Sequence, residues 1–282
     1  NLKFLFSLRP RHFAPERPQV AEFTTKKTMG QDCDVLAAKY QISREAQDAF
    51  CLRSHQLSSK AWEDGHLEKE VVTVSLPPKF KPINRDNGVR VSSLEKLAKL
   101  RPAFDKKYGT LTAANSSFLT DGGSAGLFMT ESKAKVLGLV PKAEIIDFCF
   151  TGQELEEELL LGPAFASAKV LDKTGLTLDD MDVIEFHEAF AGQILANLAC
   201  LESATFAKEK LNRAQAVGKI PMSKFNLWGG SLSLGHPFGA TGLRLINTAA
   251  NRLQHEGGKY ALIAACAAGA HGHAMILKRY EA

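Results

Sequence analysis

Apolar strand segments and helical segments alternate through the last half of the chain, and glycine-rich turns connect several of them. The pattern predicts, in chain order, a helix over 131–137, a strand over 143–150, a helix opening after Pro163, a strand over 182–186, and then a helix over 189–201, a helix over 240–254 and a last strand over 260–266. Strands separated by helices are typical of layered α/β domains, because helices cover the faces of the sheet. The chain is therefore predicted to have an α/β fold.

The first half of the chain has fewer regular elements. Helical periodicity runs from Asp34 to Asp64, with Ser43 as a predicted N-cap. Residues 72–76 alternate as a strand, and residues 77–110 are rich in Lys, Arg, Pro and Asn. We expect the latter stretch to be a long excursion with one short helix over 93–100.

Composition excludes several classes of protein. The 282 residues are 45% hydrophobic and 23% charged, which is ordinary for a globular chain and unlike a disordered, collagenous or coiled-coil one. The net charge of +4 is spread along the chain, so it favours nucleic acid no more than another anionic ligand. Five cysteines without a CxxC spacing argue against a disulfide framework and for a reducing compartment. No apolar run approaches the roughly 20 residues that span a bilayer.

Residues 1–20 combine apolar and aromatic side chains with cations, and Glu16 is their one acid. Such a segment suits a membrane surface that carries anionic lipid, and its composition resembles a mitochondrial presequence, although three prolines would interrupt a long helix. It would equally suit a loop whose aromatic side chains pack while its arginines face water. Because the sequence opens with Asn1 rather than Met, we expect a processed, truncated or partial chain.

His187 and Glu188 directly follow the predicted strand that ends at Phe186. A histidine at a strand-to-helix junction can donate a hydrogen bond to an oxyanion that develops in a cleft. A histidine beside a glutamate is more often a structural pair, so this motif alone is weak support for a catalytic site.

His236 lies inside the segment GGSLSLGHPFGATG, with glycines on both sides and Pro237 directly after it. Glycines let the backbone turn tightly, and such a turn can hold an imidazole beside a nucleophile. A glycine-rich turn before a helix can also bind phosphate, but the segment lacks the Lys-Ser/Thr pair and the GxGxxG spacing of such loops. A catalytic turn is therefore the favoured interpretation.

Cys266 ends the last predicted strand and opens a turn of small residues, CAAGAHGHA. A thiol there can exchange a proton with a substrate carbon if its pKa is tuned toward neutrality. A structural cysteine that behaves as a small hydrophobe is the alternative. His271 and His273 follow, but their spacing matches no familiar zinc motif, so we expect no metal site.

In this order, the segments HEAFA, GGSLSLGHPFGATG and CAAGAHG resemble the three C-terminal signatures of the thiolase family. Two further segments, TAANSSFLTDGGSAGLFMTESKAKVLGL and MGQDCDVLAAKYQISREAQDAFCLRSHQ, resemble the end of the thiolase N-terminal domain and the loop domain. The resemblance extends from about Met29 onward and implies the layered αβαβα thiolase fold. It implies a loop domain over 1–108 with a membrane-facing segment at 1–20, the end of the N-terminal domain over 109–150 and the C-terminal domain over 151–282.

Most thiolases carry Asn at the start of the HEAFA segment, where this chain has His187. That histidine and the basic, aromatic N-terminal segment resemble the long-chain branch of the family, found in the mitochondrial trifunctional complex. The resemblance implies a 3-ketoacyl-CoA thiolase of fatty-acid β-oxidation, which uses coenzyme A to cleave its acyl-CoA substrate into acetyl-CoA and a shortened acyl-CoA. It also implies a homodimer that pairs with an α subunit, in the mitochondrial matrix or at the inner membrane. Coenzyme A is then a substrate, and neither a cofactor nor a nucleic-acid partner is expected.

The resemblance assigns a role to each of the three candidate residues. His236 would be the general base that activates the attacking cysteine, and Cys266 would protonate the acetyl-CoA enolate. His187, directly or through water, would stabilise the enolate oxygen together with His236. Ketoacyl synthases share the fold but typically use two histidines, so Cys266 favours a thiolase.

Three further positions match the family. Ser117 and Phe190 match positions that line the path of coenzyme A, and the backbone N–H of Ala268 matches an oxyanion donor that is usually a glycine. The nucleophilic cysteine of the family lies in the first half of the N-terminal domain, and none of the other four cysteines here has a matching context. We therefore expect these residues alone to have no thiolase turnover.

Three alternatives remain open. An acetoacetyl-CoA thiolase or a sterol-carrier-type thiolase would share the signatures and differ in chain-length preference. A non-catalytic scaffold would use the same fold to dock an α subunit and a membrane. A Cys/His hydrolase would use Cys266 as its nucleophile and would hydrolyse its substrate without coenzyme A.

Overall fold

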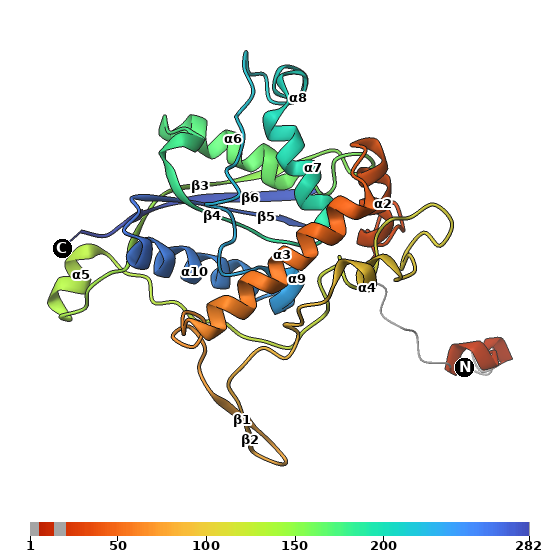
Figure 1. Ribbon diagram of the computed structural model, residues 1–282, viewed down its shortest axis with the longest axis horizontal. Helices are drawn as coiled ribbons and strands as arrows, with labels where there is room; N and C mark the ends of the chain where they lie inside the picture. Colours follow the sequence, from red (N-terminus) through yellow and green to blue (C-terminus); the bar gives the residue numbers. More distant parts are fainter. Residues whose placement is uncertain (1–5, 14–20, 282) are drawn as a thin grey trace.

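The computed structural model describes residues 6–13 and 21–281 (Figure 1). In chain order, its helices and strands are η1 Pro10–Phe13, α2 Met29–Lys39, α3 Arg44–Glu63, β1 Val74–Leu76, β2 Lys81–Ile83, α4 Leu94–Ala98, α5 Glu131–Val136, β3 Ala143–Gly152, α6 Gly162–Thr174, η2 Leu178–Asp180, β4 Met181–Phe186, α7 Ala191–Glu202, α8 Ala204–Lys210, α9 Ser231–Leu234, α10 Thr241–Glu256, β5 Tyr260–Ala267 and β6 His271–Arg279. Within the described residues, no helix has both the length and the apolar character needed to cross a bilayer.

Four strands form the central sheet in the order β3-β6-β5-β4. β4 and β5 run parallel, whereas β6 pairs antiparallel with both β5 and β3. The prediction that the strand ending at Cys266 is the last one is therefore wrong. Gly269 and Ala270 have φ values of 80° and 54°, and two left-handed residues in succession reverse the chain within a tight turn. The sequence His-Gly-His at the start of β6 hid this strand from the pattern of alternating apolar residues.

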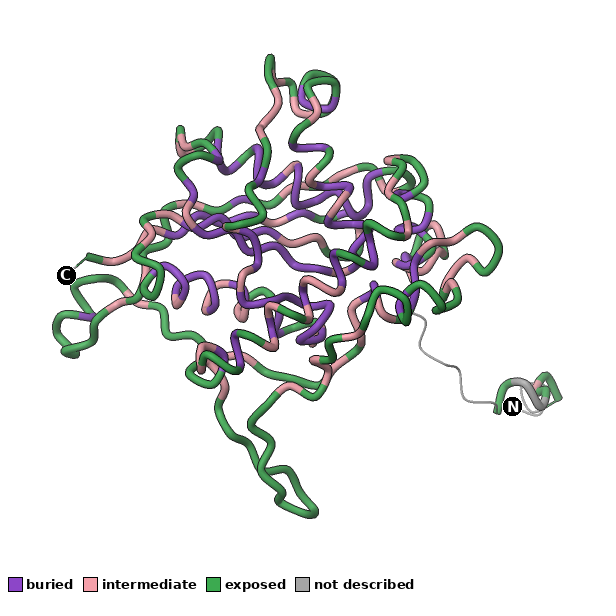
Figure 2. Tube along the Cα trace, viewed as in Figure 1, coloured by how far each residue is buried: buried purple, intermediate pink, exposed green. Residues whose placement is uncertain are grey.

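Helices cover both faces of the sheet, so the predicted α/β class is confirmed (Figure 1). α6 lies against β3, β5 and β6, whereas α10 lies on the opposite face against β4, β5 and β6. Pro163 stands in the first turn of α6, where its fixed φ suits a helix start. On α10, Leu245, Ala249 and Leu253 recur at helical spacing and join a buried cluster with residues of the sheet. Figure 2 shows that buried residues concentrate in β4, β5 and β6 and in the helix segments beside them, whereas β3 is largely exposed.

The helical pattern over 34–64 belongs to two helices rather than one. Thr28 caps α2 in a capping box. Gln41 then has a φ of 53°, which turns the chain between the helices. Ser43 caps α3, as predicted, by accepting a hydrogen bond from the Ala46 N–H. Because α2 packs against α7, and α3 packs against α7 and α9, these two helices brace the segments that carry the candidate site.

A short antiparallel hairpin of β1 and β2 projects from the body of the molecule (Figure 1). β1 falls within the strand predicted over 72–76, whereas β2 falls within the stretch predicted as an irregular excursion. Pro82 inside β2 disguised the second strand, because proline is rare in strand interiors. Both strands are exposed over their whole length, so the hairpin lies outside the core (Figure 2).

The membrane-facing segment predicted at 1–20 lies largely outside the described residues. Its described part, residues 6–13, leaves the side chains of Phe6 and Phe13 85% and 73% exposed. The predicted domain boundary at residue 150 falls inside β3, which pairs with β6 from end to end. Membrane contact and the division into domains both stay predictions.

Candidate active site

His187 stands at the carboxyl end of β4, where its backbone N–H donates to the Ala264 carbonyl at 2.8 Å and extends the pairing with β5. The imidazole is buried, and its Nδ1 lies 2.9 Å from Ser231 Oγ. Arg244 Nη2 donates to the same oxygen at 3.2 Å. Among the described residues, Nδ1 is the one acceptor within reach of the single Ser231 hydroxyl proton, and we assign that proton to the Ser231–His187 hydrogen bond. This assignment puts the His187 proton on Nε2 and makes Nε2 a hydrogen-bond donor.

His236 follows α9 and Gly235, whose φ of 90° favours glycine. A side chain at position 235 would also overlap Thr120, so the turn has no room for another residue type. The His236 backbone N–H donates to the Phe118 carbonyl at 3.2 Å. The imidazole Nδ1 lies 2.7 Å from the hydroxyl of Thr241, the first residue of α10. The predicted turn thus holds the ring at its backbone and at one ring nitrogen.

Thr241 decides which nitrogen of His236 is free. Its hydroxyl donates to the Pro237 carbonyl at 3.1 Å, and we therefore assign a proton to His236 Nδ1, which donates to the Thr241 oxygen. Nε2 keeps a lone pair, which is the state a general base needs. The His187 and His236 ring centroids lie 4.0 Å apart. Two adjacent imidazoles therefore offer opposite chemistry, a donor at His187 and an acceptor at His236.

Both imidazoles are held neutral. Burial, with a smaller contribution from the Arg244 cation, lowers the pKa of His236 to about 4. Burial, then His236 and Arg244, lowers the pKa of His187 well below its usual value. A neutral ring can accept a proton, which an imidazolium cannot do. The pair is therefore in the correct state for a base and a neutral donor at physiological pH.

Cys266 lies near the end of β5 and is half-buried. Cys266 is two residues beyond Ala264, whose carbonyl accepts the hydrogen bond from the His187 N–H. Because side chains alternate along a strand, Cys266 lies on the same face of β5 as Ala264, at the carboxyl end of the strand. Burial raises the pKa of its thiol to about 12. A pKa near neutrality was the condition for proton exchange by this thiol, and burial shifts the pKa away from it, because desolvation opposes the thiolate. A protonated thiol is nevertheless the form that donates a proton to an enolate.

The turn after Cys266 is tied to the segment that precedes α2. The Gly269 N–H donates to Glu22 Oε2 at 3.0 Å, and this carboxylate is nearly buried. Ala268 is exposed in the same turn. Its role as an oxyanion donor stays a prediction.

Ser117 and Phe190 come together although they are far apart in the sequence. Ser116 and Phe190 form an antiparallel bridge, and the Ser117 N–H donates to the Ala189 carbonyl at 2.9 Å. Phe190 is buried edge-on against Phe104, with ring centroids 5.9 Å apart. The structure thus makes the two predicted coenzyme A residues neighbours, while their contact with coenzyme A stays a prediction.

Glu188 is a structural anchor rather than a partner of His187. Its buried carboxylate accepts hydrogen bonds from Ser54 Oγ at 2.7 Å, Asn226 Nδ2 at 2.8 Å and the Leu232 N–H at 3.2 Å. These bonds join α3, the segment before α9 and α9 itself around the end of β4. The alternative of a His–Glu structural pair is not supported, because the two side chains bond different partners.

Sequence reasoning missed the residues that orient the two histidines. They are Ser231, Thr241 and Arg244, and the first two stand five residues either side of His236 in the glycine-rich segment. The signal available in the sequence was the pair of hydroxyl residues that flank His236, the candidate base. Short hydroxyl side chains commonly hydrogen-bond an imidazole and fix the orientation of its ring. Arg244 gave no such signal, since its reach to Ser231 depends on the packing of α10.

The other four cysteines differ from Cys266. They are Cys33, Cys51, Cys149 and Cys200, all buried, and burial raises the pKa of each thiol. Burial and a high pKa both oppose the thiolate state that a nucleophile needs. Among residues 6–13 and 21–281, no group of three or more His, Cys, Asp or Glu side chains could hold a metal ion.

Alkylation of the native protein is expected to modify Cys266 before the four buried cysteines. Its rate should rise about tenfold per pH unit below the thiol pKa of about 12, because only the thiolate attacks. Iodoacetamide labelling followed by peptide mass spectrometry at several pH values measures both effects. Labelling of Cys266 at neutral pH as fast as a free cysteine would contradict the raised pKa.

Comparison with known families identifies the family of the chain. The model of "Thiolase, C-terminal domain" matches residues 139–279, and the model of "Thiolase, N-terminal domain" matches residues 14–132. The chain belongs to the thiolase family. These matches confirm the resemblance drawn from the three C-terminal signatures.

Curated relatives of this thiolase chain include the mitochondrial trifunctional enzyme subunit beta of Homo sapiens. It is 55% identical over 280 residues, which cover 99% of the chain and 59% of the relative. A probable 3-ketoacyl-CoA thiolase of Caenorhabditis elegans is 54% identical over 268 residues, which cover 95% of the chain and 60% of the relative. The thiolase chain therefore spans about three fifths of the length of these relatives.

Solved structures share the fold of this thiolase chain. The human mitochondrial 3-ketoacyl-CoA thiolase matches with a TM-score of 0.80 and 31% identity, over 93% of this chain and 62% of that one. The same human enzyme in complex with CoA matches with a TM-score of 0.80 and 30% identity, over 96% of this chain and 67% of that one. The predicted thiolase fold is confirmed.

Proposed function

We propose that the protein is a subunit of a 3-ketoacyl-CoA thiolase of fatty-acid β-oxidation. The supporting observation is the pair of buried, neutral imidazoles of His187 and His236, whose ring centroids lie 4.0 Å apart. In this proposal His236 is the base, His187 the neutral donor, and the protonated thiol of Cys266 near the end of β5 the acid.

In the proposed reaction, a cysteine thiolate attacks the keto carbon of 3-ketoacyl-CoA after His236 takes its proton. The bond between the second and third acyl carbons breaks, and its electron pair forms the acetyl-CoA enolate, whose oxygen accepts a hydrogen bond from His187 Nε2. Cys266 gives its proton to the enolate carbon and releases acetyl-CoA. The Cys266 thiolate then takes the proton of a fresh coenzyme A thiol, and the coenzyme A sulfur attacks the acyl carbon with the Ala268 N–H as oxyanion donor. The bond from the acyl carbon to the attacking cysteine breaks, and that cysteine takes back the proton held by His236. The attacking cysteine belongs to the part of the relatives' length that these 282 residues do not span.

The substrates and partners follow from the same proposal. Acyl-CoA and coenzyme A are the substrates, with Ser117 and Phe190 on the coenzyme A path, and no cofactor is needed. The name of the human relative supports a mitochondrial location and pairing with an α subunit in a trifunctional complex. We further propose a homodimer and a membrane contact through residues 1–20.

The test is thiolysis by the complete protein. Acetoacetyl-CoA, 3-ketooctanoyl-CoA and 3-ketohexadecanoyl-CoA are each supplied with coenzyme A, and acetyl-CoA release is measured. The long-chain proposal expects the highest kcat/KM with 3-ketohexadecanoyl-CoA, whereas preference for acetoacetyl-CoA would favour the short-chain alternative. Release that does not depend on coenzyme A would indicate a hydrolase, and no release with any substrate would indicate a scaffold. The 282 residues alone serve as the inactive control.

A further inference from the structure

The hairpin of β1 and β2 projects from the body of the molecule, and every residue from 72 to 85 is exposed (Figure 1, Figure 2). Its base is held by Arg85, whose guanidinium carbon lies 5.2 Å from the centroid of the Trp62 ring. At the tip, the Phe80 N–H donates to the Leu76 carbonyl at 2.9 Å and closes the turn. A two-stranded hairpin with water on both faces has little stability of its own, so a further contact would stabilise it.

The pairing register gives the hairpin one apolar face. Val74 stands opposite Ile83, and Leu76 stands opposite Lys81. Because side chains alternate along a strand, these four residues share one face, while Ser75 and its partner share the other. The three apolar side chains are each about half exposed, so none of the described residues covers this face. The hairpin is therefore amphipathic.

The charge at the tip of the hairpin has one sign. Phe80, whose side chain is 65% exposed, stands between Lys79 and Lys81 in the sequence. No acidic residue occurs from 71 to 85. Among the described residues, neither lysine has an ion-pair partner. The tip thus combines an exposed aromatic ring with two uncompensated cations.

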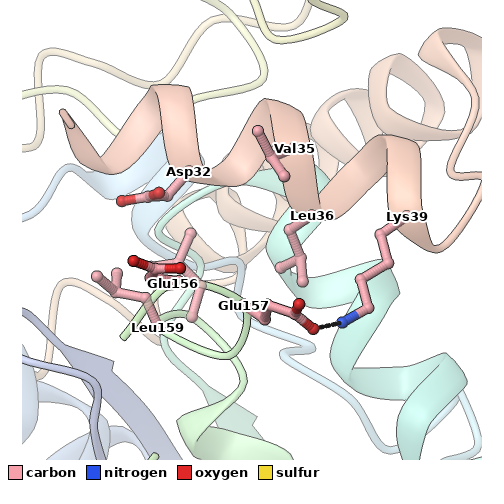
Figure 3. Close-up of a pocket in the computed structure, with 8 residues that line it drawn as sticks. Asp32, Val35, Leu36, Lys39, Glu156, Glu157 and Leu159 are labelled. Atoms are coloured by element: carbon pink, nitrogen blue, oxygen red, sulfur yellow. Dashed lines mark hydrogen bonds and ion pairs between the residues drawn. The ribbon is translucent and has the colours of Figure 1, made fainter. Parts of the chain in front are cut away.

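Several lysines elsewhere on the surface are neutralised by carboxylates. Beside the pocket between α2 and the loop that joins β3 to α6, Lys39 Nζ lies 2.7 Å from Glu157 Oε2 (Figure 3). Lys60 and Asp64 form another such pair at 2.8 Å. The hairpin differs from these places, because its positive charge is left for a negative surface outside the described chain to compensate.

The dimensions of the hairpin suit a lipid surface better than a protein partner. A stable protein interface takes roughly 20–30 residues from each side, which is more than residues 71–85 offer. A lipid interface asks for less, since an amphipathic element binds with its apolar face about 5–10 Å deep and its cations near the headgroups. Two strands of three residues each, at about 3.3 Å per residue, reach about 10 Å and so match that depth.

We propose that the β1–β2 hairpin docks on a membrane surface that carries anionic phospholipid. Its apolar face and Phe80 enter the boundary between headgroups and acyl chains, and Lys79 and Lys81 bind lipid phosphates. This contact is separate from the one proposed for residues 1–20. It does not depend on the thiolase proposal, because its test follows the surroundings of one side chain rather than turnover.

A tryptophan at the tip reports the contact directly. Phe80→Trp in the complete protein is mixed with vesicles of phosphatidylcholine and phosphatidylglycerol in equal parts, with and without brominated acyl chains. Its emission is expected to shift to shorter wavelength and to be quenched by bromine, because the ring leaves water for lipid. Val136→Trp, at an 80% exposed position on α5, is the matched control. It should be quenched no more than the wild type, whose Trp62 and Trp228 are buried.

The role of charge is tested with pairs of lysines in the Phe80→Trp protein. Replacing Lys79 and Lys81 with Gln is expected to raise the lipid concentration needed for quenching about fivefold for each lysine removed. Replacing Lys106 and Lys107, another exposed pair, with Gln is the control and should change nothing. Salt at about 0.5 M should weaken the quenching by screening the lysines, and vesicles of phosphatidylcholine alone should quench little.

Two results would overturn the proposal. The first is no quenching at position 80, whether or not the protein binds the vesicles, because any membrane contact would then lie elsewhere. The second is a shift to shorter wavelength without vesicles that grows with protein concentration, because a second copy would then cover the apolar face. Loss of thiolysis with quenching intact would count against the thiolase proposal alone.

Discussion

Replacing His236 with Asn in the complete protein is expected to lower kcat for thiolysis by about 10²–10⁴-fold, the usual contribution of a positioned general base. The reason is local. Thr241 holds the Nδ1 proton of His236, so Nε2 is the one ring atom able to take the thiol proton, and Asn has no such basic nitrogen. Steady-state kinetics with 3-ketoacyl-CoA and coenzyme A measure the loss.

Two further variants separate chemistry from folding. Thr241→Ser keeps the hydroxyl and should retain most activity, whereas Thr241→Val removes it and should lower kcat with little change in KM, because the ring can then adopt the wrong tautomer. His255→Asn, on the exposed end of α10, is the control and should behave as wild type.

Because the pKa of His236 is lowered to about 4 and its neutral form is the base, its titration should reduce kcat/KM only as the pH falls toward about 4. Activity of His236→Asn within a few-fold of wild type would rule out the assigned role.

The second large effect concerns stability. Arg252 on α10 and Glu185 on β4 are both fully buried, and Arg252 Nη1 lies 2.7 Å from Glu185 Oε1. Arg252 also donates to Glu256 at 2.7 Å and to the Lys224 carbonyl at 3.2 Å. Arg252→Met is expected to lower the free energy of unfolding by about 3–5 kcal/mol above neutral pH, because it leaves a buried carboxylate without its counter-charge.

This loss should depend on pH. Burial, opposed by Arg252, raises the pKa of Glu185 from 4.5 to about 7, so the folded state binds this proton more tightly than the unfolded state. The contribution of Glu185 is therefore fully present below about pH 4.5 and falls as the pH rises through about 7, and removing Arg252 raises the pKa further. Urea unfolding followed by circular dichroism should show a larger defect at about pH 8 than at about pH 5. Lys60→Met, which breaks the exposed pair with Asp64, should change nothing measurable, and an equal defect at both pH values would contradict the assignment.

The sequence predicted what depends on local rules. Ser43 was a clear cap, Pro163 a clear helix start, and the small residues around His236 and Cys266 marked turns at strand ends. Two strands, β2 and β6, were missed. A proline inside β2 and the His-Gly-His sequence at the start of β6 interrupt the alternation of apolar and polar residues by which a strand is predicted. Their pairing with neighbours is set by tertiary contacts, which a single sequence does not display.

The sequence suggested three candidate catalytic residues, His187, His236 and Cys266, but not their electrostatics. The structure brings the two histidines into contact, and the catalytic roles of all three stay predictions. The raised pKa of Cys266 could not be read from the motif, because burial is a property of the assembled fold. The tautomers were equally hidden, since they follow from single hydrogen bonds made by Ser231 and Thr241.

The support behind His236 is a neutral hydroxyl, whereas the Ser-His-Asp triad places a carboxylate there. A carboxylate would stabilise the protonated imidazole by its negative charge, whereas the Thr241 hydroxyl carries no charge. In the proposed reaction, each proton that His236 accepts would therefore be held weakly and passed on readily to the next leaving group. His236 would then act as a proton shuttle of low proton affinity, and the protonated ring would not accumulate between the two half-reactions.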